Sequence, residues 1–326
     1  MSVWTEKVSL FSEIRHSMER IPTPMAGLGL GIASLGWALE NAMPFGGAAQ
    51  TTGAALSSVL LACVVGKFML HPLLVIKEMR HPVQGSILPT LAMGMMVVSK
   101  AVSSSAPAVG QGMWLAAVGL HLFFLVGFVW CQSRNFTFSS MVPSWFVPPV
   151  GIITAALTSP EGIFAPFADM LFLFGVVSFA MLLPVMVYRL IFHTEIVDAA
   201  KPTIAILAAP ASLSLAGYLS VEPQPSLILV AILLGMAILM TAVIYIGLIH
   251  LLRLPFSPAY AAFTFPLVIS STALFKAMDL FASNPVTTAY ADLLRRMAIA
   301  ELIVAVVVVS YVSWLYVRAG SKALLR

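Results

Sequence analysis

Long apolar runs separated by short polar clusters make up most of this chain. With breaks placed at proline, glycine and polar clusters, the pattern predicts ten helices, at 23–43, 52–76, 84–104, 111–132, 143–158, 164–193, 202–220, 226–252, 258–277 and 294–318. About 20 apolar residues in a helix cross the hydrocarbon core of a bilayer. The runs are therefore expected to be membrane spans, of which the fifth and ninth are the weakest by hydropathy.

A proline or a glycine interrupts this pattern at a regular interval. The positions are Gly29, Pro89, Pro149, Pro210 and Pro266, at steps of 60, 60, 61 and 56 residues. A second series precedes the first by a few residues each time: Pro22, Pro82, Pro143, Pro202 and Pro258. Two spans with their turns need about 50 to 60 residues. The repeat therefore predicts an all-α integral membrane protein, whose ten transmembrane helices form five helical hairpins in a quasi-five-fold arrangement.

The composition agrees with a bilayer as the solvent. The 326 residues are 60% hydrophobic and 9% charged, with a mean hydropathy of +1.00, whereas about 25% of residues in a soluble domain are charged. Exposing so much apolar surface to water would cost about 25 cal/mol per Å². A water-soluble protein is excluded on this ground.

The polar segments divide the chain. Residues 1–20 are polar, and no signal-type apolar region with a small-residue cleavage site follows them, so no signal peptide is expected. They are either an amphipathic helix at the membrane surface or a frayed tail. Residues 21–318 form the expected ten-helix domain, and 319–326 form a C-terminal tail.

The basic residues predict the orientation. Thirteen Lys and Arg lie on the side of the termini and the even-to-odd loops, against Lys100, Lys276, Arg295 and Arg296 on the other side. The positive-inside rule then places both termini in the cytoplasm, in a bacterial-type cytoplasmic (inner) membrane. The net charge of +4 follows from this orientation and indicates no nucleic-acid partner.

The prolines predict which helices are inner. A proline inside a helix removes a hydrogen bond and leaves a carbonyl unpaired, which hydrocarbon tolerates poorly. The regular breaks fall in the odd-numbered helices, while Pro184 is the exception in an even one. We therefore expect five kinked inner helices that form a pore, surrounded by five straighter outer helices.

Small and hydroxyl residues follow each break. The candidate pore-lining residues are Ser34, Thr90, Thr154, Ser212, Ser214, Ser270 and Ser271. Ordinary helix packing, which also uses small residues, is the alternative interpretation. The regular position of these residues in five segments favours a conduit.

Ionisable residues are absent from the central stretches of the five inner helices. A proton-coupled or sodium-coupled carrier usually has such residues there, and a cation pore has acidic rings. A neutral lumen with positive charge near its mouths instead suits anions. No His, Cys or carboxylate cluster indicates an enzyme, a metal site or a cofactor. His121 and Glu301, on even helices, are interpreted as subunit-contact or interface side chains.

Several short motifs resemble the tellurite-resistance/dicarboxylate transporter family, which contains bacterial TehA and the plant guard-cell slow anion channels. They are the Pro22 to Pro44 segment, Arg80-His81-Pro82, Phe146-Val147-Pro148-Pro149, Ala208-Ala209-Pro210-Ala211 and Phe263-Thr264-Phe265-Pro266. Gly29 stands where related chains typically have proline. The resemblance implies a pore of five inner helices, a homotrimer, and Phe265 as a ring that blocks the pore.

Three functions remain open at this point. The leading hypothesis is a channel for small monovalent anions such as chloride or nitrate, gated by Phe265. The alternative is a carrier for a C4-dicarboxylate, sulfite or a tellurium oxyanion, although a dicarboxylate site would be expected to hold cationic donors. A membrane scaffold or sensor is the third, which the short polar segments outside the spans disfavour.

Overall fold

Helices account for nearly all of the residues that the computed structural model describes, which are 15–134 and 136–324, and no strand occurs among them. The expected segment 1–20 and the tail 319–326 therefore lie partly outside the described residues. The elements are α2 (Met25–Ala42), α3 (Ala48–Leu70), α4 (Pro72–Arg80), α5 (Pro82–Ile87), α6 (Pro89–Ser103), α7 (Pro107–Ser133), η1 (Phe138–Ser140), η2 (Pro143–Phe146), α8 (Val147–Val150), α9 (Ile153–Leu157), η3 (Gly162–Phe164), α10 (Ala165–Phe192), η4 (Asp198–Ala208), α11 (Ala209–Val221), α12 (Leu227–Leu251), η5 (Pro258–Phe263), α13 (Thr264–Ser283), η6 (Thr288–Tyr290) and α14 (Ala291–Leu324).

Eight helical segments of the described chain are long and apolar enough to cross a membrane. The expected first and fifth spans are not among them. The first corresponds to α2, and the fifth is broken into η2, α8 and α9. The chain is thus an all-helical, multi-pass membrane protein.

Burial separates two kinds of segment, as the prolines predicted. The spans Pro82–Ser103, Asp198–Val221 and Pro258–Ser283 are buried over 83%, 72% and 83% of their apolar windows. The other five spans are buried over 22% to 44%. These outer helices expose large apolar side chains such as Phe123, Leu173 and Ile246. Such an apolar surface is favourable in contact with lipid and unfavourable in contact with water.

The inner segments contact one another in a closed order. α2 packs against α6, α6 against α9, α9 against α11, α11 against α13, and α13 against α2. Each of them also packs against the next outer helix of the chain: α3, α7, α10, α12 and α14. We call α2, α6, α9, α11 and α13 the inner ring.

Four of the regular prolines lie in the first turn of a helix. Pro89 is the first residue of α6, Pro210 the second of α11 and Pro266 the third of α13. A proline in the first turn removes no helical hydrogen bond, because the first amide groups have no partner within the helix. Pro149 lies in α8, just before the interruption that separates α8 from α9. α2 continues through Gly29, which keeps its amide hydrogen.

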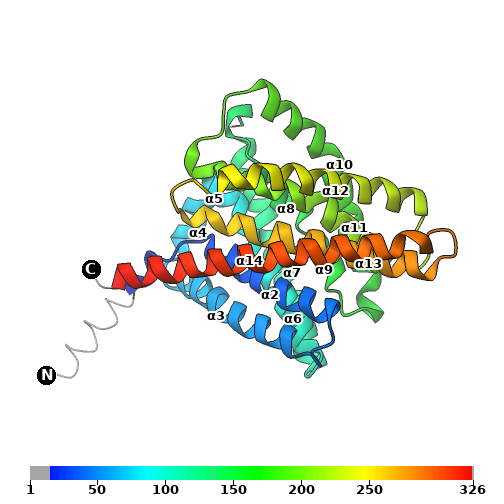
Figure 1. The fold of residues 1–326 in the computed structure, drawn as a ribbon. Coiled ribbons are helices and arrows are strands. Elements are labelled where there is room, and N and C mark those ends of the chain that lie inside the picture. The colour runs from blue at the N-terminus through cyan, green and yellow to red at the C-terminus, as the bar shows by residue number, and fades with distance from the viewer. Residues whose placement is uncertain (1–14, 135, 325–326) are drawn as a thin grey trace, which may run out of the picture.

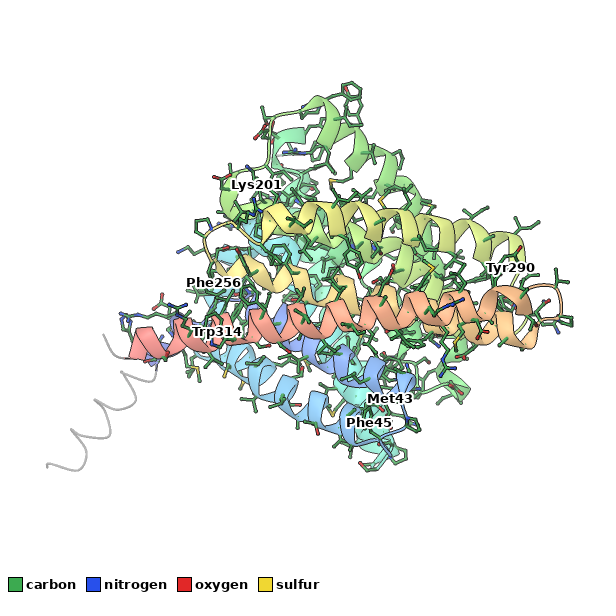
Figure 2. The ribbon with its side chains drawn as sticks, in the orientation of Figure 1. Met43, Phe45, Lys201, Phe256, Tyr290 and Trp314 are labelled. Atoms are coloured by element: carbon green, nitrogen blue, oxygen red, sulfur yellow. The ribbon has the colours of Figure 1, made fainter. Side chains whose placement is uncertain are left out.

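The connections alternate between the two ends of the bundle. In Figure 1, α4 and α5 lie at the end from which the C-terminal part of α14 projects. Figure 2 shows Lys201, Phe256 and Trp314 toward that end, and Met43, Phe45 and Tyr290 toward the other end. Arg318 lies over the half-exposed Trp314 ring, 5.2 Å from its centroid. Aromatic and cationic side chains of this kind are typical of a membrane interface.

Candidate functional site: an apolar cavity inside the inner ring

A small cavity of about 60 Å³ lies between the inner segments. Every one of the five sequence repeats contributes to its wall, for example through Leu30, Met93, Val150, Leu213 and Phe265. The wall carries no charged side chain, and Thr90 is the only hydroxyl residue in it, among the residues that the structure describes. The cavity is thus neutral, as predicted, but more apolar than the sequence suggested.

Phe265 lies in the wall of this cavity, directly before Pro266. Its side chain is largely buried, with 8% exposed. Phe263, two residues earlier, is fully buried and packs edge-on against Tyr260, with 4.9 Å between ring centroids. The two rings therefore occupy different environments, and Phe265 is the one that faces the cavity.

The residue before Phe265 is fixed to the neighbouring inner helix. The Thr264 hydroxyl lies 2.7 Å from the Ala261 carbonyl oxygen and 3.2 Å from that of Gly27 in α2. Gly31 permits this approach, since a Cβ atom there would meet the Thr264 side chain and lie 3.2 Å from the Phe265 backbone nitrogen. The start of α13 is thereby held against α2.

The other predicted pore-lining hydroxyls are buried within the helix packing. Several donate to backbone carbonyl oxygens: Thr90 to Ile87 (2.8 Å), Ser212 to Ala208 (2.9 Å), Ser214 to Pro210 (2.7 Å), Ser270 to Leu267 (2.9 Å) and Ser271 to Ala298 (2.9 Å). The buried hydroxyls of Ser34 and Thr154 have no partner. These bonds satisfy the hydroxyl donors within the helix packing. A lining role for the residues other than Thr90 stays a prediction.

The broken fifth segment is completed by an outer helix. His121 in α7 is fully buried, and its Nε2 lies 2.8 Å from the Pro148 carbonyl oxygen. The indole nitrogen of Trp114 donates to the Ala155 carbonyl at 3.1 Å. The interpretation of His121 as a subunit-contact or interface side chain is therefore wrong, because the ring is buried against the fifth segment.

A buried ion pair at the α4 end of the bundle was not predicted. Lys67 Nζ lies 2.6 Å from Glu78 Oε1 and 2.8 Å from Thr23 Oγ1, and the Thr23 hydroxyl donates to Glu78 Oε2 at 2.6 Å. The cluster joins α3 and α4 to the residue before Pro24, which lines the cavity. Lys67 is one of the thirteen basic residues on the predicted cytoplasmic side. The signal that could have revealed the pair is a lysine, Lys67, inside the apolar run 52–76, together with Glu78 just after that run.

The opposite end of the bundle holds both basic and acidic side chains, among them Lys276 and Asp279. Lys100 lines a second hollow together with Gln50 and Gln111, and Lys276 lies near both Asp279 and Lys100. Within 15–134 and 136–324, no group of three His, Cys, Asp or Glu side chains could hold a metal ion. The described residues thus form a neutral cavity inside the inner ring and, separately, a hollow at the opposite end that Lys100 lines.

Comparison with known proteins agrees with this geometry. A family model described as voltage-dependent anion channel matches residues 25–317. One relative, an uncharacterized transporter of Methanocaldococcus jannaschii, is 27% identical over 243 residues, which are 66% of this chain and 71% of the relative. A second uncharacterized transporter of the same organism is 26% identical over 231 residues, 61% of this chain and 65% of the relative.

Proposed function

The chain belongs to the voltage-dependent anion channel family, and on that premise we propose that it conducts small monovalent anions such as chloride and nitrate through the inner ring. The observation that carries this proposal is the neutral cavity to which all five repeats contribute. A wall without charges binds an anion weakly, so the ion can leave as readily as it enters.

Phe265 is the proposed gate. Its ring occupies the cavity wall, and an apolar constriction is costly for a hydrated ion to pass. The backbone beside it is fixed to α2 through Thr264. Opening therefore requires rotation of the Phe265 side chain more than movement of the start of α13.

Lys100 and Lys276 are the proposed collectors of anions at the mouth. A pair of cationic side chains raises the local anion concentration and the rate of entry, in a manner that depends on ionic strength. Neither residue belongs to the wall of the cavity inside the inner ring. The pair thus favours entry without creating a tight site inside.

The proposal includes the arrangement in the membrane. Ten spans, with α2 and the η2–α9 segment as the first and fifth, form five hairpins, and both termini face the cytoplasm of a cell enclosed by an inner membrane. The protein is neither an enzyme nor a nucleic-acid binder. A homotrimer, with one passage in each protomer, is the assembly that the resemblance implies.

A carrier of dicarboxylates or oxyanions is the second candidate. The relatives that are named as transporters and the Lys100–Lys276 pair favour it. Against it stands the cavity wall, which offers no cationic donor for a second carboxylate among the described residues.

Reversal potentials in a planar bilayer separate these candidates. We expect the potential to follow imposed gradients of chloride and nitrate and to ignore a gradient of malate. Saturable, proton-dependent uptake of labelled malate into proteoliposomes, without measurable chloride current, would contradict the channel.

A further inference from the structure

A second polar site lies behind the inner ring, between α11, α13 and the outer helices. Glu301 of α14 is buried there, with 8% of the residue exposed. Ser212, Thr241 and Ser270 line the same pocket. No sequence motif marks this group, because its members come from four different helices.

Three buried polar atoms at or beside this pocket make no hydrogen bond of good geometry. They are Glu301 Oε2, Thr241 Oγ1 and the Tyr245 hydroxyl oxygen. Ser270 lies beside both the Tyr245 hydroxyl and the Glu301 carboxyl group. Buried polar atoms nearly always have hydrogen-bond partners, so several without one at the same place indicate a binding site.

No cation faces the Glu301 carboxyl group in the part of the chain that the structure describes. The charged or titratable residues on the elements packed against α14 or around this pocket are Lys276 and Asp279 in α13, Glu40 in α2, Tyr218 in α11, Tyr245 and His250 in α12, Tyr260 in η5 and Tyr290 in η6. Of these, Tyr245 alone interacts with Glu301. An ionised carboxylate buried without a cation would cost several kcal/mol.

We propose that Glu301 is a proton-binding site, protonated in the arrangement described, and that release of its proton alters the packing of α14 and α12 against α13. Binding forms one O–H bond on the carboxyl group, and release returns that proton to water. The carboxylate left behind must gain water or an ion, for which the packed helices leave little room. Ser270 lies five residues after Phe265 in α13, so the site acts on the helix that carries the proposed gate.

Infrared difference spectroscopy of the full-length protein in lipid tests proton binding directly. As the pH is raised, the wild type should lose the carbonyl-stretch band of a buried protonated carboxyl group. E301Q should lack this change, while E195Q, at an exposed loop carboxylate, should retain it. The same pH-dependent band in E301Q would overturn the proposal.

A second variant keeps the proposal testable if E301Q does not fold. Tyr245→Phe keeps the carboxyl group and removes the neighbouring hydroxyl, so it should move the midpoint of the band's titration. An unmoved midpoint in a folded Y245F protein would mean that the titrating group lies elsewhere.

The effect on conduction rests on the proposed function and is measured separately. Anion current should rise with pH in the wild type and in E195Q, and should become independent of pH in E301Q. A current in E301Q with the pH dependence of the wild type would contradict the coupling to α13. If no variant carries anion current, the proposed function fails, while the infrared result still decides whether Glu301 binds a proton.

Discussion

Phe265 stands between two residues whose backbone is held in place. Thr264 donates its hydroxyl to carbonyls of its own segment and of α2, and Pro266 fixes its own φ angle. The ring of Phe265, in contrast, faces the cavity. The backbone at this position is thus held by its neighbours, whereas the Phe265 side chain has space beside it.

Removing the Thr264 hydroxyl should weaken this anchor. Thr264→Val keeps the shape of the side chain and leaves the Gly27 carbonyl without this donor. A loss of a buried hydrogen bond costs about 1–3 kcal/mol, so we expect a lower midpoint of unfolding in detergent. Thr52→Val, at an exposed position of α3, is the matched control. Equal stability of the two variants would contradict the anchoring role.

At the scale of helices, the contact between α2 and α13 is unusually close. A Cβ atom on Gly31 would meet the Thr264 side chain, and the Phe265 backbone nitrogen limits any shift. We expect Gly31→Ala to separate the two helices, at a cost of about 1–3 kcal/mol, and to change the anion current. Thermal unfolding and bilayer recording measure the two effects.

Gly119 provides the control for that substitution. It lies in the outer helix α7, and a Cβ atom there would meet nothing within 4 Å. Gly119→Ala should leave stability unchanged or raise it by up to about 1 kcal/mol, since alanine favours a helix. A destabilised G119A would show that the loss in G31A is not specific to the contact between α2 and α13.

The Lys67–Glu78 pair should behave as a coupled unit. Lys67→Met leaves the Glu78 carboxylate buried without its cation, at an expected cost of about 3–5 kcal/mol. The double variant K67M/E78L should recover much of this loss. A double-mutant cycle of unfolding free energies measures the coupling, and additive losses would contradict it.

The elements differ in how far the sequence predicted them. A proline marks its segment whatever surrounds it, so the inner position of the segments that carry Pro89, Pro210 and Pro266 could be predicted. The sequence did not show that these prolines begin helices, because the short helices before them carry no separate signal. Nor could it show that hydroxyls such as Ser271 bond to backbone carbonyls, since that depends on which helix faces the side chain.

At the scale of the whole molecule, charge is distributed unequally between the two ends of the bundle. Thirteen Lys and Arg belong to the predicted cytoplasmic side and four to the other. A topology reporter fused after Arg326 should indicate a cytoplasmic position for the C-terminus. A reporter inserted at Gly46 should indicate a position outside the cytoplasm. The reverse pattern would contradict the orientation, and with it the place of Lys100 and Lys276 at the outer mouth.

The account of the whole molecule depends on a passage that Phe265 closes. The most direct test is the anion current of Phe265→Ala in a planar bilayer, compared at equal protein amount with the wild type and with Phe123→Ala, which alters an exposed ring of the outer helix α7. We expect F265A to raise the chloride current at least tenfold, which corresponds to about 1.4 kcal/mol removed from the barrier, and F123A to leave it unchanged. An unchanged chloride current in a folded F265A protein would contradict the account.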